Sequence, residues 1–194
     1  MISKFMSRAA AIGAAGALGA VALVGIAPSA DAAKPLPTNY TCDIVGGLDT
    51  AVTIGLPSSV KAKDAKKGLS AKSFTLTITL SEGIAGALRG LTDSVAGSAS
   101  GVSYKVAGVS KAVPVNNLAI KPTDVGTSGP LVLKAQASGA QGVFKLTKKG
   151  TFAVSAPKSF TFTPTGGDGS PLVGDLGCAL STGAPSKVGS IKVK

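Results

Sequence analysis

Apolar and polar residues alternate strictly along one segment of the chain, Phe74-Thr75-Leu76-Thr77-Ile78-Thr79-Leu80. Successive side chains of a β-strand point to opposite faces of a sheet, so this alternation predicts a strand with one buried face. Weaker versions of the pattern predict eight further strands, at residues 40–45, 50–56, 95–106, 113–120, 131–137, 142–146, 152–154 and 160–163. Period-two alternation dominates the chain, and it favours an all-β fold.

Residues that favour turns separate the predicted strands. Clusters containing Gly, Pro, Ser or Asp occur at 46–47, 57–58, 127–130, 149–150 and 166–169. Such clusters supply the backbone angles that tight turns need. The one segment with helical spacing is 84–91, where Ile84, Leu88 and Leu91 share a face. Short strands with regular turn signals are typical of a β-sandwich or a barrel.

The first 32 residues have the organisation of a secretory signal peptide. Lys4 and Arg8 precede an apolar run over 9–26, and Pro28 and Ser29 lead to the small-x-small sequence at 30–32. Cleavage after Ala32 leaves one domain, residues 33–194. The alternative is an uncleaved anchor helix, because the run is just long enough to span a bilayer. We expect export without a covalent anchor, so that the protein is secreted or loosely associated with the cell wall and has no transmembrane segment after cleavage.

The chain has two cysteines, Cys42 and Cys178, at the two edges of the mature sequence. In an exported protein without metal-ligand spacing, such a pair predicts one structural disulfide. A catalytic cysteine needs a nearby base, and the chain has no histidine to supply one. A long-range disulfide and the two-sided alternation favour an Ig-like, two-sheet antiparallel β-sandwich of about eight or nine strands with one short helix.

Positive charge dominates the mature sequence. The full chain has 20 Lys+Arg and 9 Asp+Glu, and removing Lys4, Arg8 and Asp31 leaves 18 against 8, a net charge of +10. Only Arg89 is an arginine and only Glu82 is a glutamate among these. Since lysine gives a strongly hydrated point charge, this surface suits loose attraction to anions better than bidentate recognition.

Lysines gather in three runs, at 61–67, 145–149 and 187–194. The first run is the best candidate for contact with a polyanion, because four lysines there are opposed only by Asp64 and are predicted to lie on an exposed loop. The candidate residues are Lys61, Lys63, Lys66 and Lys67. The alternative is that these lysines keep strand edges soluble and prevent edge-to-edge pairing.

The sequence offers no constellation that predicts catalysis. A Ser-x-x-Lys pattern occurs at Ser58/Lys61 and Ser155/Lys158, but its serine nucleophile belongs on a helix, and prolines place both copies at strand-to-turn junctions. Carboxylate pairs for glycoside hydrolysis are nearly excluded by the small number of acidic residues. We therefore expect that the protein has no catalytic residues and is not an enzyme.

Cofactor and metal sites are not expected either. Asp168 and Asp175 lie in a Gly-rich segment, but the alternating acidic positions of a calcium loop are missing, so we interpret them as turn residues. With no Trp and two Tyr, the chain lacks the aromatic platforms on which bases or sugars stack. Specific nucleic-acid binding is therefore not expected.

Short motifs spread over most of residues 39–180 resemble a known family. They are Tyr40-Thr41-Cys42, Ser128-Gly129-Pro130, Gly150-Thr151, Asp168-Gly169-Ser170 and Cys178. On these motifs the chain resembles a family of secreted actinobacterial domains catalogued as a domain of unknown function, and it departs from that family around 84–100. The resemblance implies export, a β-sandwich and a disulfide, and it supplies no activity or catalytic residue.

Two classes of function remain open. The first is a secreted, non-catalytic module of the cell envelope or extracellular space, whose partner is an anionic cell-wall polymer or an envelope protein. The second is a carrier that holds an apolar small molecule or lipid between its sheets, because the small side chains of the strands can leave a cavity.

Overall fold

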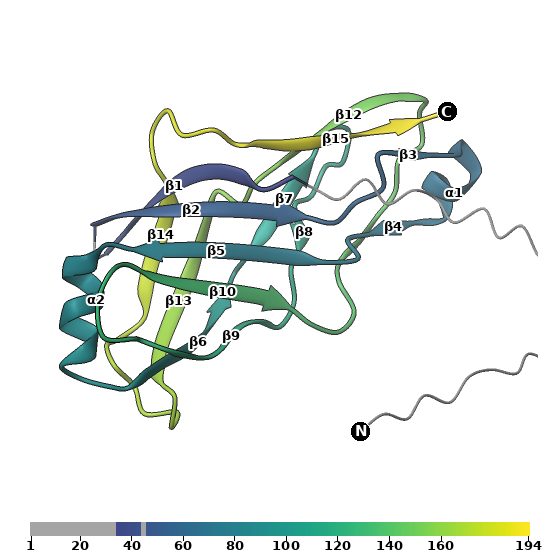
Figure 1. Ribbon diagram of the computed structural model, residues 1–194. Coiled ribbons are helices and arrows are strands. Elements are labelled where there is room, and N and C mark those ends of the chain that lie inside the picture. The colour runs from purple at the N-terminus through teal and green to yellow at the C-terminus, as the bar shows by residue number, and fades with distance from the viewer. Residues whose placement is uncertain (1–33, 44–45) are drawn as a thin grey trace, which may run out of the picture.

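Eight antiparallel strands form a closed barrel in the computed structural model, which describes residues 34–43 and 46–194 (Figure 1). Around the barrel the strands follow in the order β1 (Leu36–Cys42), β14 (Leu176–Leu180), β13 (Ser159–Gly166), β6 (Ser94–Ser100), β9 (Leu118–Asp124), β10 (Leu131–Ala137), β5 (Phe74–Leu80) and β2 (Gly46–Ile54). The last strand pairs with the first, so the ring of hydrogen bonds is complete. The predicted signal peptide, residues 1–32, lies outside the described residues.

Every second side chain along the strands points inward and fills the interior of the barrel. Along β5 the apolar residues Phe74, Leu76, Ile78 and Leu80 are buried, while the threonines between them are only partly buried. This confirms the predicted strand at 74–80, and β10 confirms the one at 131–137. Eight strands enclose an interior that is just wide enough for side chains to fill.

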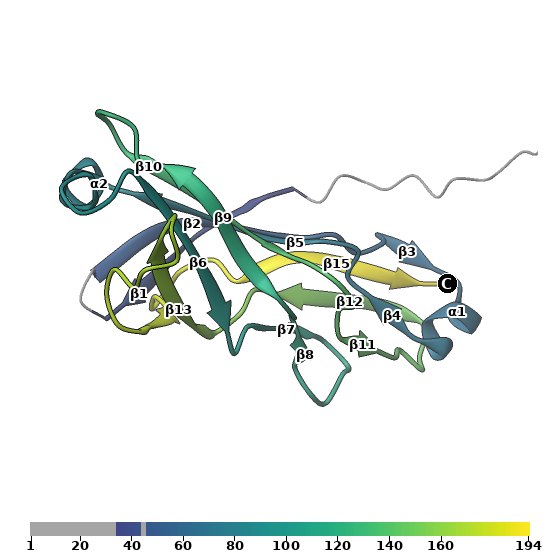
Figure 2. The same cartoon turned by 90° about the horizontal axis from the view of Figure 1, so that it is seen from below.

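A second group of strands extends the fold at one end of the barrel (Figure 2). A five-stranded sheet has the order β3 (Ser59–Val60), β15 (Lys187–Val193), β12 (Gly150–Ser155), β7 (Ser103–Val106) and β8 (Val113–Pro114), and a two-stranded sheet joins β11 (Val143–Phe144) to β4 (Leu69–Ser70). Within the five-stranded sheet only β3 and β15 run parallel. The buried side chains of the barrel and of this extension belong to one continuous cluster.

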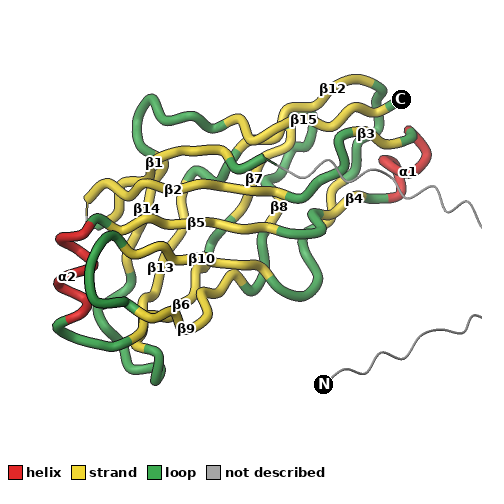
Figure 3. Tube along the Cα trace, viewed as in Figure 1, coloured by secondary structure: helices red, strands yellow, loops and turns green. Residues whose placement is uncertain are grey.

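The two helices of the described residues lie at opposite ends of the structure (Figure 3). Helix α1 (Ala62–Lys67) lies beside the short strands, and helix α2 (Glu82–Arg89) covers the far end of the barrel. Each helix buries one alanine, Ala65 in α1 and Ala85 in α2. The sequence predicted one helix, at 84–91. Helix α2 confirms a helix there but starts and ends two residues earlier, so Leu91 lies outside it and is exposed.

The disulfide predicted between Cys42 and Cys178 is present. The two residues are directly opposite each other on the neighbouring strands β1 and β14, with Cα atoms 4.0 Å apart. Both side chains are buried. The bond therefore joins strands separated by 136 residues in sequence, at the point where the barrel closes.

The fold is mostly β, as predicted, but the Ig-like sandwich is not confirmed. A sandwich has two separate sheets with free edges, whereas here β1 pairs with both β2 and β14 and so leaves no edge between them. Fifteen strands are present among the described residues instead of eight or nine, partly because two predicted strands are interrupted. The strand predicted at 95–106 breaks between β6 and β7. The one predicted at 113–120 breaks at 115–117, where Asn117 has a left-handed φ of 51°.

Candidate functional site

The four lysines singled out by the sequence are all exposed, but they do not lie on a loop. Lys61 immediately precedes α1, and Lys63, Lys66 and Lys67 belong to it. Alanine and lysine are good helix formers, and Ala65 is fully buried, which fixes the helix on the rest of the fold. The prediction of an exposed loop was therefore wrong about the backbone, while the exposure it predicted is present.

Long-range hydrogen bonds bring the other two lysine runs to the same place. The Leu146 N–H donates to the Ala65 carbonyl at 3.1 Å, which holds the segment between β11 and β12 against α1. The Ala62 N–H donates to the Lys194 carbonyl at 3.0 Å, which holds the end of β15 against the start of α1. We call the resulting surface the basic end. It consists of nine exposed lysines: Lys61, Lys63, Lys66, Lys67, Lys145, Lys148, Lys149, Lys192 and Lys194.

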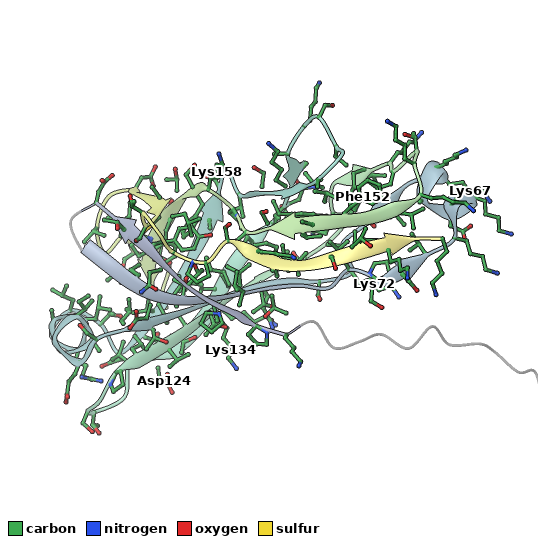
Figure 4. All side chains as sticks on the ribbon, turned by 90° about the horizontal axis from the view of Figure 1, so that it is seen from above. Lys67, Lys72, Asp124, Lys134, Phe152 and Lys158 are labelled. Carbon is green, nitrogen blue, oxygen red and sulfur yellow. A yellow bond between two sulfur atoms is a disulfide. The ribbon has the colours of Figure 1, made fainter. Side chains whose placement is uncertain are left out.

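Negative charge is concentrated away from the basic end. Asp64 is the one acidic residue within its segments, 59–70, 143–151 and 190–194. Glu82 lies on α2. Asp124 ends β9, and Asp93 lies beside it, because the Asp93 carbonyl accepts a hydrogen bond from the N–H of the next residue, Val125. Figure 4 shows Lys67 at one end of the molecule and Asp124 toward the other. The charge distribution is therefore strongly asymmetric along the length of the molecule.

Lys187 does not share this surface, although the sequence groups it with Lys192 and Lys194. It is at the start of β15, opposite Ser155, whereas Val193 is opposite Gly150 at the other end of the strand pair. A β-strand rises about 3.3 Å per residue, so Lys187 is roughly 15–20 Å from the basic end.

A second candidate feature is an apolar cavity of about 90 Å³ inside the barrel, beneath α2. Ile84 and Leu88 of α2 form its cover. Its walls come from the barrel strands and the loop before β14: Leu48, Ile78, Leu80, Val95, Leu133, Phe162, Pro164, Val173 and Leu176. No polar surface lines this cavity.

Helix α2 is attached to the barrel rim by Arg89 and Glu82, the one arginine and the one glutamate among the residues that the structure describes. The Arg89 guanidinium donates to the carbonyls of Val125, Gly126 and Gly129, at 3.1, 3.2 and 2.5 Å. The Gly129 N–H donates to Glu82 Oε1 at 3.3 Å. In the sequence these two residues stand out only as compositional exceptions, and their shared partner, the loop between β9 and β10, was not predicted.

Two buried tyrosines have contrasting environments. The Tyr40 hydroxyl donates to the Pro157 carbonyl at 2.7 Å, and burial raises the pKa of this phenol far above its ordinary value. Burial likewise raises the pKa of Tyr104 to about 12. The Ala71 N–H, which faces the Tyr104 oxygen, acts in the opposite direction and lowers this pKa. That approach falls outside hydrogen-bond geometry, so the Tyr104 hydroxyl has no hydrogen-bond partner among residues 34–43 and 46–194.

The aspartates of the Gly-rich segment form local contacts. Asp168 Oδ1 accepts hydrogen bonds from the Ser170 N–H and hydroxyl at 2.9 and 2.6 Å, and these bonds lower the pKa of the Asp168 carboxyl. Asp175 accepts a bond from the Thr163 hydroxyl instead. Over residues 34–43 and 46–194, no three acidic or cysteine side chains come close enough together to hold a metal ion. Within the same residues, neither helix has the length and apolarity needed to cross a membrane.

Comparison with known proteins identifies a family for this chain. No curated protein and no solved structure matches it. The sequence model of DUF6801, a family of unknown function, matches residues 39–189, from β1 into β15. This match covers the barrel, both cysteines and two of the three lysine runs. The chain therefore belongs to DUF6801, a family of unknown function.

Proposed function

We propose that the protein is a secreted, non-catalytic module that binds anionic polymers of the cell envelope through its basic end. The single observation that carries this proposal is the convergence of nine exposed lysines from three separate segments on one end of the fold, with Asp64 as the one acidic residue among them. Export is supported by the predicted signal peptide and by the disulfide, which persists in oxidising compartments.

Lysine ammonium groups suit a polymer of repeated negative charges. Each is a hydrated point charge that needs no fixed partner geometry, so a flexible polyanion can contact several at once. A lysine near an anionic surface contributes about 1 kcal/mol to binding, and the attraction decays over a Debye length of about 8 Å at physiological ionic strength. Because Asp64 is the one acidic residue among these lysines, the basic end is the part of the molecule that a polyanion attracts most strongly.

The test compares two variants that lose the same charge. In the first, Lys61, Lys63, Lys66 and Lys67 are replaced by glutamine. In the control, four exposed lysines outside the basic end are replaced by glutamine, namely Lys105, Lys121, Lys134 and Lys158. Figure 4 shows Lys134 and Lys158 well separated from Lys67.

The measurement is the affinity for purified bacterial cell walls as a function of salt. Four lysines contribute up to about 4 kcal/mol, so the first variant is expected to lose at least tenfold in affinity at low salt. The control is expected to lose much less, and both are expected to melt within a degree or two of the parent. If the two variants lose equal affinity, binding depends on net charge alone and the basic end is not a site. If the first variant binds like the parent, the proposal is wrong.

A carrier of an apolar molecule is the second candidate function, and the apolar cavity beneath α2 is the observation that favours it. The rest of the barrel interior holds large buried side chains such as Tyr40, Phe74 and Leu76. Within the part of the chain that the structure describes, the apolar space for a guest in the barrel is therefore at its α2 end.

A further inference from the structure

We propose that the cavity beneath α2 binds the end of an unbranched hydrocarbon chain, with α2 as a movable cover. This inference rests on the carrier function and makes it specific, because it names the site, the class of ligand and the part of the fold that admits it. It is independent of the basic end, which lies at the other end of the molecule (Figure 3).

The lining of the cavity selects an apolar guest. A buried water needs two to four polar partners, and this cavity supplies no polar surface. Apolar cavities of this kind stay dry, and a cavity of about 150 Å³ is known to bind benzene. By the same scale, the 90 Å³ found here accommodates about three or four carbon atoms.

The route to the surface selects a chain rather than a compact molecule. Val173 lines the cavity and is also 40% exposed, so the cavity reaches solvent beside this residue. A guest with a few carbons inside can continue past Val173 to the outside. An alkyl chain that carries a polar group at one end fits both the apolar cavity and the opening to solvent. Its apolar end is buried in the cavity, while its polar group stays hydrated outside.

The construction of α2 allows it to move. Gly83 and Gly86 are exposed and have open space around them, so no packing constraint requires glycine at either position. Glycine weakens a helix relative to alanine, and an eight-residue helix is marginal by itself. The polar contacts of α2 go to one loop, 125–129, through Arg89 and Glu82. Helix and loop can therefore shift as a unit, while Ile84 and Leu88 slide away from the cavity.

Titration with n-hexanol, followed by methyl NMR, tests the site. We expect saturable shifts of the Ile84, Leu88, Val95 and Leu133 methyl signals, with no saturable shift for Val106 and Val154 of the five-stranded sheet. Cyclohexanol has as many carbons but no linear chain, and it is expected to bind at least tenfold more weakly. If n-hexanol gives no saturable shift at the cavity methyls, the proposed site is wrong. If cyclohexanol binds equally well, the assignment to chains is wrong.

Two substitutions at exposed valines provide a matched pair. Val173→Trp fills the opening and is expected to weaken n-hexanol binding at least tenfold. Val132→Trp places the same side chain on the outer face of β10, where Val132 is 45% exposed, and is expected to change binding less than twofold. Equal effects of the two variants would overturn the proposed opening.

A third variant tests the cover. In Gly83→Ala/Gly86→Ala the helix is stiffer and meets no steric conflict, so n-hexanol is expected to associate at least threefold more slowly. An unchanged association rate would mean that α2 does not gate the cavity.

Native mass spectrometry separates this site from the carrier function on which it rests. The protein purified from its producing organism is expected to retain a molecule with an alkyl chain, which Val173→Trp should lose. If n-hexanol binds as expected but no such molecule co-purifies, the site is established and the carrier function is wrong. Loss of the lysines in the first glutamine variant is expected to leave n-hexanol binding unchanged.

Discussion

The same substitution at the two buried tyrosines is expected to have opposite effects on stability. Tyr40 and Tyr104 are both fully buried, and each ring packs edge-on against a phenylalanine, Phe160 and Phe144 respectively. Their hydroxyl groups differ, because that of Tyr40 donates to the Pro157 carbonyl while that of Tyr104 has no hydrogen-bond partner in the described part of the chain. Tyr40→Phe and Tyr104→Phe therefore remove the same atom from comparable packing but change the hydrogen bonding differently.

The magnitudes follow from the cost of unpaired polar groups. Tyr40→Phe removes a hydrogen bond worth about 1 kcal/mol and leaves a buried carbonyl unpaired, so we expect a loss of about 1–3 kcal/mol in the free energy of unfolding. Tyr104→Phe removes a buried hydroxyl that already lacks a partner, so we expect no loss and a gain of up to about 1–2 kcal/mol. The two variants should therefore differ by at least about 1–2 kcal/mol.

Urea unfolding of the parent and both variants measures this difference. With a slope of about 2 kcal/mol/M, a difference of 2 kcal/mol moves the midpoints about 1 M apart. The slopes themselves should agree, which shows that the change is in stability and not in the unfolded ensemble. If Tyr104→Phe loses as much stability as Tyr40→Phe, the Tyr104 hydroxyl must have a partner, for which the Ala71 N–H is the candidate, and the reasoning fails.

Two further predictions concern the disulfide and alkaline pH. Closing a loop of 136 residues stabilises the fold by about 5 kcal/mol in the chain-entropy picture, so Cys42→Ala/Cys178→Ala should lower the Tm by about 10–20 °C in a calorimetric scan. A change below about 3 °C would show that the cross-link hardly constrains the unfolded chain. Burial raises the pKa of Tyr104 from its ordinary value of 10 to about 12, and the pKa of Tyr40 is raised as well. The contribution of these two protonated phenols to the free energy of unfolding is complete below pH 10. It is lost as the pH rises toward 12, because the tyrosines of the unfolded chain release their protons at a lower pH than those of the folded protein. Since the chain has two Tyr and no Trp, absorbance at 295 nm should report tyrosinate only as the protein unfolds; free titration near pH 10 in the folded state would contradict this.

Local patterns predicted the individual strands better than their arrangement. The segment 74–80 was found at its predicted bounds because every second residue is apolar and faces the interior. The strand at 187–193 was missed because Val188 and Gly189 interrupt this alternation near its start. Barrel closure was also missed, since the inner face of a barrel and that of a sandwich need the same alternation.

In the candidate sites too, the sequence predicted single residues better than the way in which distant segments come together. The exposure of Lys61 and its neighbours follows from charge alone, but the arrival of Lys145 and Lys192 beside them depends on pairing between β12 and β15 and on contacts with α1. Likewise, Arg89 was conspicuous as the one arginine of residues 33–194, yet its partners are 36–40 residues away in sequence. Interactions of this range leave no local pattern.

The pairing of β1 with β14 imposes an order on folding. β1 and β2 are neighbours in sequence and can pair at once, but the other edge of β1 stays open until residues 176–180 are available. Contacts this far apart in sequence slow folding, because the chain must lose the entropy of a long loop before the contact forms. A chain interrupted before β14 would expose unpaired edges on both β1 and β13, and open edges promote aggregation. Formation of the Cys42–Cys178 bond therefore reports that the last barrel strand has taken its place.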